Sequence, residues 1–247
     1  MDDESVSRAR RRAQREQELE LHRELRPQLA LAALGALLVG VAYLLLPASL
    51  TVGPNWLLLA IEAVVLLPLT VSAYFRPLPP MLMRGMKIAL QVALTLALLT
   101  SLTLLVANLS EFQRGAQVLR PAALLWVSNI LIFAVSYWEL DGGGPAKRHV
   151  RGHQAGDFLF PQYAVPTLEP SSAHTASPKP EQVHPTRSRR WIPGYVDYLF
   201  LAFGFATALS PADTAPLTPR AKLLMMAEAL ISLTIIVVLI GRSINIL

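Results

Sequence analysis

Apolar residues along this chain gather into six long runs, which polar and charged residues separate from one another. A helix needs about 20 apolar residues to cross the hydrocarbon core of a bilayer. The runs lie at about 28–48, 55–75, 87–108, 120–138, 194–211 and 223–243. Because a helix satisfies its own backbone groups in lipid, the pattern predicts an all-α polytopic membrane protein, a bundle of six transmembrane helices.

Composition agrees with this prediction. Of the 247 residues, 53% are hydrophobic and 16% are charged, and the mean hydropathy is +0.43. This balance is typical of a polytopic membrane protein rather than of a soluble domain. The formal charge of +5 comes from segments between the apolar runs, so membrane orientation explains it better than nucleic-acid binding.

Four regions follow from the pattern. Residues 1–27 are charged and predict a cytoplasmic helix, without a cleavable signal peptide. Residues 28–138 form a four-helix transmembrane region, and residues 139–193 a Pro-rich, largely disordered loop that opens with the turn Asp141-Gly-Gly-Gly-Pro145. Residues 194–247 contain a C-terminal helical pair.

Orientation follows from the positions of Lys and Arg, which concentrate on the cytoplasmic side of membrane proteins. With six spans and both termini in the cytoplasm, 18 of these residues lie inside and 4 outside. In the alternative, the fifth run is re-entrant and only five runs cross. Keeping the C-terminus inside, as channels do, would then place the basic segments outside. The charge count therefore favours six spans and a cytoplasmic N-terminus.

The C-terminal region, residues 195–247, resembles the pore helix, filter and inner helix of potassium channels. It has the aromatic start YVDYLF, the exit residues Pro216, Leu217 and Thr218, and a basic residue before a long apolar helix. The filter positions read Ala208, Leu209, Ser210, Pro211, Ala212 and Asp213, of which only Asp213 matches the family. Serine and alanine replace the filter glycines, which disfavours a filter of backbone carbonyls. The resemblance implies a degenerate pore loop and a homo-oligomer.

Three shorter motifs are similar to those of a family of bacterial polytopic membrane proteins. They are DGGGP, DFLFPQ and SPxDT, found at residues 141–145, 157–162 and 210–214. This resemblance covers about the C-terminal half of the chain. It implies the inner membrane of a bacterium and no particular activity.

Two carboxylates lie within predicted spans, Glu62 in the second and Glu228 in the sixth. Both spans run from outside to inside in the six-span arrangement, which places both groups roughly 8–11 Å below the outer surface. A carboxylate at this depth is costly and indicates function. With Asn129, Ser210 and Asp213, the two glutamates are candidates for an ion pathway that takes a proton or a monovalent cation. The alternative is that each glutamate is protonated or hydrogen-bonded and helps helices to associate.

Other chemistry finds little support in the sequence. His149, His153 and Asp157 have helical spacing, but Gly152 and Gly156 interrupt such a helix and nearby basic residues repel a divalent cation. The chain has no cysteine, nucleotide-binding loop or zinc motif. The sequence therefore predicts no metal, no cofactor and no enzymatic activity.

Two classes of function remain open. In the first, the protein is a channel-like or transporter-like ion pathway that uses Glu62, Glu228 and the segment from Ser210 to Asp213. In the second, it is a non-conducting membrane scaffold or accessory subunit whose partner docks on the basic cytoplasmic segments.

Overall fold

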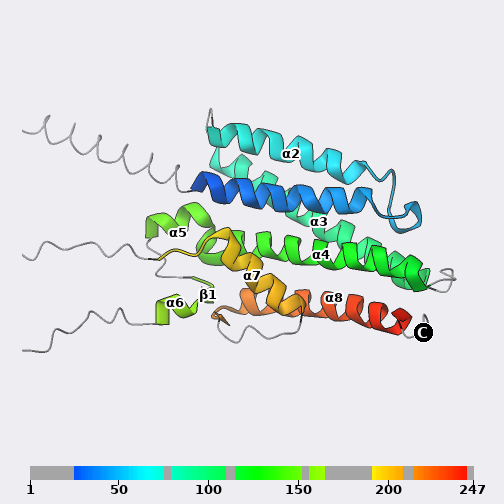
Figure 1. Cartoon of the computed structure of the whole chain (residues 1–247). Coiled ribbons are helices and arrows are strands. Elements are labelled where there is room, and N and C mark those ends of the chain that lie inside the picture. Colours follow the sequence, from blue (N-terminus) through cyan, green and yellow to red (C-terminus); the bar gives the residue numbers. More distant parts are fainter. Residues whose placement is uncertain are drawn as a thin grey trace, which may run out of the picture.

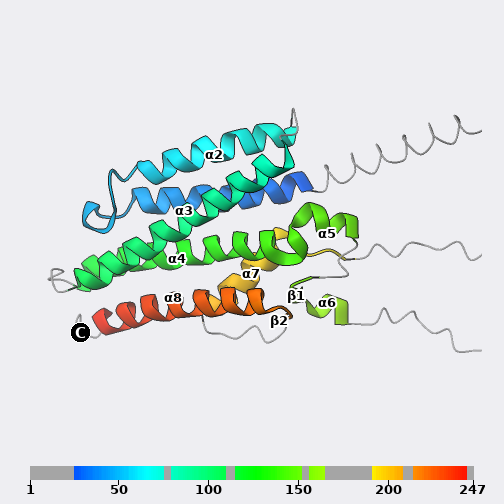
Figure 2. The same cartoon turned by 180° about the vertical axis from the view of Figure 1, so that it is seen from behind.

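The computed structural model describes residues 25–74, 79–109, 115–151, 156–164, 191–207 and 214–243. Long helices lie side by side and make up most of it (Figures 1 and 2). The elements are the Leu25–Leu44 helix, followed by η1 (Ala48–Leu50), α2 (Leu57–Tyr74), α3 (Pro80–Ala107), α4 (Gly115–Leu140), η2 (Asp141–Gly143), α5 (Pro145–Arg151), β1 (Phe158–Leu159), α6 (Pro161–Ala164), α7 (Tyr195–Ala206), β2 (Ala215–Pro216) and α8 (Pro219–Ser243).

Four helices are long and apolar enough to cross a membrane, namely Leu25–Leu44, Met81–Ala107, Gln117–Arg148 and Pro219–Arg242. A fifth apolar helix, Leu57–Ser72, is shorter and runs alongside the first (Figure 1). The outward side chains of α8 include Leu223 and Leu230, which are 66% and 63% exposed. An apolar outer surface of this kind is suited to contact with the hydrocarbon core of a bilayer. The length and composition of these helices therefore indicate a membrane protein.

The two ends of the bundle are fixed by contacts between neighbouring helices. At one end, Lys87 of α3 pairs with Glu139 of α4, with 2.6 Å between Nζ and Oε1. At the other, Asn108 Nδ2 after α3 donates to the backbone oxygen of Ser49, at 3.4 Å. We call these the proximal and distal ends. The Leu25–Leu44 helix begins at the proximal end, and the chain finishes at the distal end (Figure 1).

Two buried clusters form the core. One is aliphatic and joins α3 to the Leu25–Leu44 helix, α4 and the second half of α8. The other is rich in aromatic residues and lies towards the proximal end, where α4, β1 and α7 meet. Its rings make edge-to-face contacts, for example Trp138 with Tyr195 and Phe160 with Tyr198, at 5.9 and 5.3 Å between centroids. The aromatic cluster therefore holds α7 against α4.

The six-span prediction is not confirmed, because α7 does not cross the bundle. Its 12 residues extend roughly 18 Å, against roughly 30 Å of hydrocarbon. It ends beside the middle of α4, where Trp126 Nε1 donates to Ala206 O at 3.1 Å. The chain then returns to the proximal end, where β2 pairs antiparallel with β1. Helix α7 thus begins at the proximal end, and the chain is back at that end by β2, while four of the other apolar helices are long enough to cross a membrane.

Local sequence explains the turn after α4 and the start of α8. Glycines 142, 143 and 144 all have positive φ, of 60°, 81° and 103°, which residues with a Cβ rarely adopt. Helix α8 begins with Pro219 at its first position, after Thr218, whose hydroxyl accepts from Ala221 N at 3.4 Å. The predicted stop after the fourth span is confirmed. Part of the predicted disordered loop is ordered as η2, α5, β1 and α6, and its residues 165–190 lie outside the described part.

The contact between the Leu25–Leu44 helix and α7 can be tested at Gly35. A Cβ added there would overlap the Tyr195 hydroxyl, whereas nothing lies within 4 Å of one added at Gly85. We expect Gly35→Ala to lower the free energy of unfolding in detergent by about 1–2 kcal/mol. Gly85→Ala should leave it unchanged or raise it by up to about 1 kcal/mol. Equal effects of the two substitutions would contradict the packing of α7 described above.

Candidate functional site

Four buried polar side chains meet where α4 packs against α8. Tyr137 donates its hydroxyl to Glu228 Oε2, and Asn129 Nδ2 donates to Ser232 Oγ at 2.9 Å. Glu228 and Asn129 are fully buried, with 0% exposure. We call these four residues the α4–α8 seam. Because Glu228 and Ser232 are four residues apart, they lie on one face of α8, one turn from each other.

Two acceptor atoms of the α4–α8 seam are unused. Neither Glu228 Oε1 nor Asn129 Oδ1 has a hydrogen-bond partner among the described residues. A buried polar atom without a partner costs about 1–3 kcal/mol. The seam therefore combines a carboxyl group, an amide oxygen and two hydroxyl groups inside the bundle, with acceptor capacity left for a proton or a cation.

Two further carboxylates, Asp141 and Asp157, are fully buried at the proximal end. Asp141 Oδ1 accepts from the backbone N–H of Asp157 and of Phe158, the latter at 3.3 Å. Its Oδ2 accepts from the Tyr198 hydroxyl. Asp141 thus fastens the start of α7 and the start of β1 to the end of α4.

Asp157 binds residues at the beginning of α8. Its Oδ1 accepts from Thr218 Oγ1 at 2.6 Å and from Arg220 Nε at 2.7 Å. Its Oδ2 accepts from Arg220 Nη2 at 2.7 Å and from Gly142 N at 3.0 Å. The bidentate Arg220 pair and the other bonds occupy both carboxylate oxygens. Asp157 therefore ties the beginning of α8 to the glycine turn.

A buried arginine, Arg148, contacts the same end of α4 as Asp141 and Asp157. It is 2% exposed, and its Nη1 donates to the backbone oxygens of Trp138 and Asp141, at 2.7 and 2.6 Å. Its guanidinium carbon lies 5.0 Å from the centre of the Tyr198 ring, in reach of a cation–π interaction. We call Asp141, Arg148, Asp157, Tyr198, Thr218 and Arg220 the proximal network. The protein itself supplies donors to its carboxylates, which indicates a structural clamp.

The structure does not bring Glu62 and Glu228 together, although the six-span prediction places both at a similar depth. Helix α2 begins at the distal end and α8 at the proximal end, so the two helices run in opposite directions. Helices α2 and α8 also lie on opposite sides of the bundle in both views (Figures 1 and 2). Glu62 is fully buried against Gly40 of the Leu25–Leu44 helix, far from the α4–α8 seam.

Of the predicted site residues, Asn129 and Glu228 come together in the α4–α8 seam, joined through Ser232 and Tyr137. Ser210, Asp213 and His153 lie outside the described residues, and the side chain of His149 is not among those described. Asp157 belongs to the proximal network. Among the described residues, no three His, Asp or Glu side chains are grouped to hold a metal ion.

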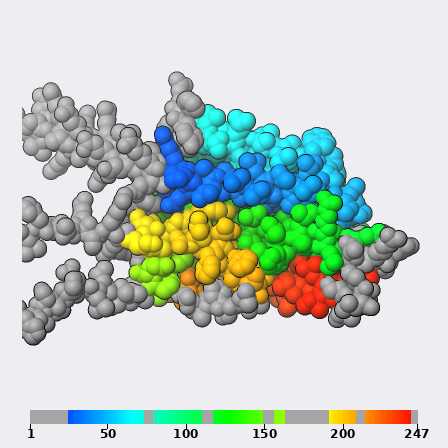
Figure 3. Space-filling model, in the orientation of Figure 1, coloured from blue at the N-terminus to red at the C-terminus, as the bar shows by residue number. Residues whose placement is uncertain are grey.

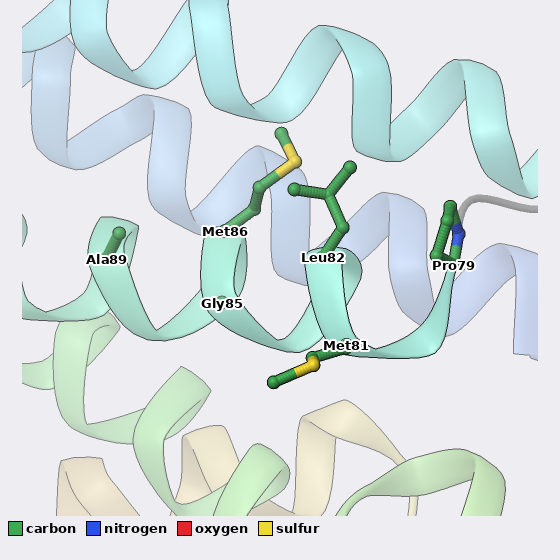
Figure 4. A pocket seen from close by; sticks show the side chains of 6 residues that line it. All are labelled: Pro79, Met81, Leu82, Gly85, Met86 and Ala89. Atoms are coloured by element: carbon green, nitrogen blue, oxygen red, sulfur yellow. The ribbon is translucent and has the colours of Figure 1, made fainter.

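Two shallow hollows on the described surface are apolar. One, at the start of α3, is lined by Pro79, Met81, Leu82, Gly85, Met86 and Ala89 (Figure 4). The other lies between α4 and α7 and includes Trp126, Phe200 and Phe203. Helix α7 forms part of the molecular surface there, below the Leu25–Leu44 helix (Figure 3). Neither hollow presents a charged side chain, so the buried polar groups remain the candidates for chemistry.

Sequence reasoning missed Tyr137, Ser232 and most of the proximal network. A tyrosine near the end of a span is usually an interfacial anchor, and the basic residues between the apolar runs entered the sequence analysis only through the orientation count. One signal was present: the DGGGP and DFLFPQ motifs contribute Asp141 and Asp157, and the exit motif contributes Thr218. These three segments, distant in sequence, meet in the proximal network.

No protein family model, curated protein or solved structure matches this chain. The functional argument therefore rests on the two buried groups of residues alone.

The proximal network can be tested by removing one of its charges. Arg220 is 59% exposed and Asp157 is 1% exposed, so Arg220→Gln should lower the free energy of unfolding by about 1–2 kcal/mol. Lys222→Gln removes an exposed charge two residues further along α8 and should change it by less than about 0.5 kcal/mol. Chemical unfolding of both variants in the same detergent compares them. An effect of Lys222→Gln as large as that of Arg220→Gln would show that the ion pair contributes nothing specific.

Proposed function

We propose that this chain is a protein of the bacterial inner membrane whose proximal end faces the cytoplasm. The support is the distribution of Lys and Arg over the five passes and the re-entrant helix. Nineteen of the 22 belong to the proximal end: seven before residue 27, three from Arg76 to Lys87, seven from Lys147 to Arg190, and Arg220 with Lys222. Arg114, Arg120 and Arg242 belong to the distal end.

This orientation removes the conflict between a re-entrant helix and the positive-inside rule. The conflict arose when the re-entrant helix was taken to enter from outside, as a potassium-channel pore helix does. Here α7 enters and leaves at the basic end. The N-terminus is then cytoplasmic, and the C-terminus lies on the opposite side.

In this membrane, α4, α7 and α8 form a unit that moves a proton or a monovalent cation, with Glu228 as the group that binds it. The observation that carries the proposal is Glu228 itself: fully buried in a membrane helix, with one oxygen bonded to Tyr137 and the other unpartnered among the described residues. A carboxyl group in such surroundings holds a proton or a cation, because an isolated charge there is costly.

The re-entrant helix supports the same proposal. Helix α7 ends inside the bundle, and a helix C-terminus carries partial negative charge that favours cations. Non-helical backbone at membrane depth is tolerated where protein buries it or where it lines a water-filled cavity. Interrupted helices supply ion sites in transporters by this means. Glu228 lies nine residues after Pro219, roughly 14 Å into α8, which is within the depth that α7 reaches.

Flux through the reconstituted chain tests the proposal. In liposomes, a pH-sensitive dye reports proton movement, and a voltage-sensitive dye reports the movement of K⁺ or Na⁺. We expect Glu228→Gln to reduce the flux at least tenfold, because glutamine keeps the shape, cannot take up a proton at neutral pH and has no negative charge to neutralise a cation. Tyr137→Phe should also reduce it, since it removes the hydroxyl that orients the carboxylate.

Glu139→Gln is the matched control. Glu139 makes a partly exposed pair with Lys87 at the proximal end, so the same substitution there should leave the flux unchanged. No flux through the unaltered chain for any of these ions, or equal flux with Glu228→Gln, would contradict the pathway and favour a non-conducting scaffold.

A further inference from the structure

Glu62 is a buried carboxyl group that the proposed α4–α8 pathway does not use. It lies five residues after the start of α2 and is fully buried. Its carboxylate packs against the backbone of Gly40 so closely that any Cβ at residue 40 would overlap it. Leu59 flanks the same contact, because its Cδ1 would lie 2.9 Å from that Cβ. A side chain at residue 40 would therefore require the Glu62 carboxyl group to move from this position.

Neither oxygen of Glu62 has a hydrogen-bond partner among the described residues. The core around this contact is mainly aliphatic and includes Ala36, Val39 and Leu58. Metal cations in proteins need several oxygen ligands, and among the described residues no group of three His, Asp or Glu side chains that could hold a metal ion includes Glu62. A proton is then the one ligand that neutralises it without further partners.

No charged or titratable group described on the helices around Glu62 neutralises the charge of its carboxylate. Arg26 begins the Leu25–Leu44 helix, and Arg84 and Lys87 lie in the first turns of α3, all towards the proximal end. The Tyr43 hydroxyl accepts a hydrogen bond from Val52 N at 3.1 Å. Glu62 thus lacks a cationic neighbour among the described residues of these helices.

Glu62 lies near the distal end. Five residues from the start of α2 correspond to roughly 8 Å of helix. Ser101 of α3, six residues before Ala107, is at a similar depth, and its hydroxyl is also buried without a partner among the described residues. Glu228, by contrast, bonds to Tyr137, which lies three residues from the proximal end of α4. The two glutamates therefore occupy opposite halves of the bundle.

We propose that Glu62 is a second proton-binding site, separate from Glu228, which exchanges its proton with the distal side of the membrane. The proton stays on the carboxyl group while Gly40 and α2 remain in contact. Because burying an ionised carboxylate there is costly, loss of the proton favours separation of the two helices. The site rests on its own geometry and does not depend on the proposed flux through Glu228.

Infrared spectroscopy of the whole chain in lipid at pH 7 tests this site. A protonated carboxyl group has a carbonyl stretch that is well separated from the two bands of a carboxylate. We expect the unaltered chain to show a protonated-carboxyl component that Glu62→Gln removes and Glu228→Gln keeps; any component from a protonated Glu228 is removed only by Glu228→Gln. Loss of carboxylate bands alone in Glu62→Gln would overturn the proposal, because Glu62 would then be ionised.

Gly40→Ala supplies a second, independent observation. The added methyl group must displace the Glu62 carboxyl group, so the same band should shift in frequency. Gly85→Ala, where the added Cβ meets nothing within 4 Å, should leave the band in place. An unmoved band in Gly40→Ala would overturn the assignment to a carboxyl group packed against Gly40. Neither result depends on whether the protein conducts ions.

Discussion

Two buried carboxylates, Asp141 and Asp157, hold the arrangement of the C-terminal half together. Asp141 joins the end of α4 to β1 and α7, and Asp157 joins the glycine turn to the beginning of α8. Buried carboxylates are tolerated because protein donors occupy their oxygens. Together with the β1–β2 pairing, these bonds hold the beginning of α8 at the end of the bundle where α7 begins.

A half-length helix in a membrane also has to satisfy its free backbone carbonyls. At the end of α7, the backbone oxygen of Ala206 accepts a hydrogen bond from Trp126 of α4. The Thr207 hydroxyl donates to the backbone oxygen of Phe203 at 2.9 Å. The end of α7 is therefore supported from inside the bundle, while its outer face contributes to the surface. This support lets a short helix end beside the buried α4–α8 seam, where the proposed pathway places the mobile ion.

The four long helices and the shorter helix α2 could be predicted from sequence, because each corresponds to a long apolar run. The observed helices begin earlier than predicted in α3 and α8, at Pro80 and Pro219, since proline suits the first turn of a helix and polar first turns extend beyond the apolar run. The six-span prediction is not confirmed at the run 194–211, where α7 has only 12 residues. The length and composition of an apolar run do not distinguish a crossing helix from a shorter one.

The direction of α8 also decides where the candidate residues lie. The six-span prediction gave α2 and α8 the same direction and so placed Glu62 and Glu228 at one depth, whereas the two helices run in opposite directions in the structure (Figure 1). That Glu62, Asn129 and Glu228 lie within apolar helices could be predicted, because composition within a span is local information, and all three are buried in the structure. Their partners, Tyr137, Ser232 and Gly40, depend on which helices are adjacent, and no pattern in one sequence gives that. The resemblance to a channel pore stays a prediction, since its filter positions lie outside the described residues.

The re-entrant path of α7 is tested most directly by cysteine accessibility, because the chain has no cysteine of its own. Single cysteines at Gln162, Ala215 and Val52, all exposed, are treated with a membrane-impermeant maleimide on intact cells. We expect Val52→Cys to be labelled, and Gln162→Cys and Ala215→Cys to be protected alike until the membrane is opened. Labelling of Ala215→Cys together with Val52→Cys, while Gln162→Cys stays protected, would mean that α7 crosses the membrane and would contradict the account.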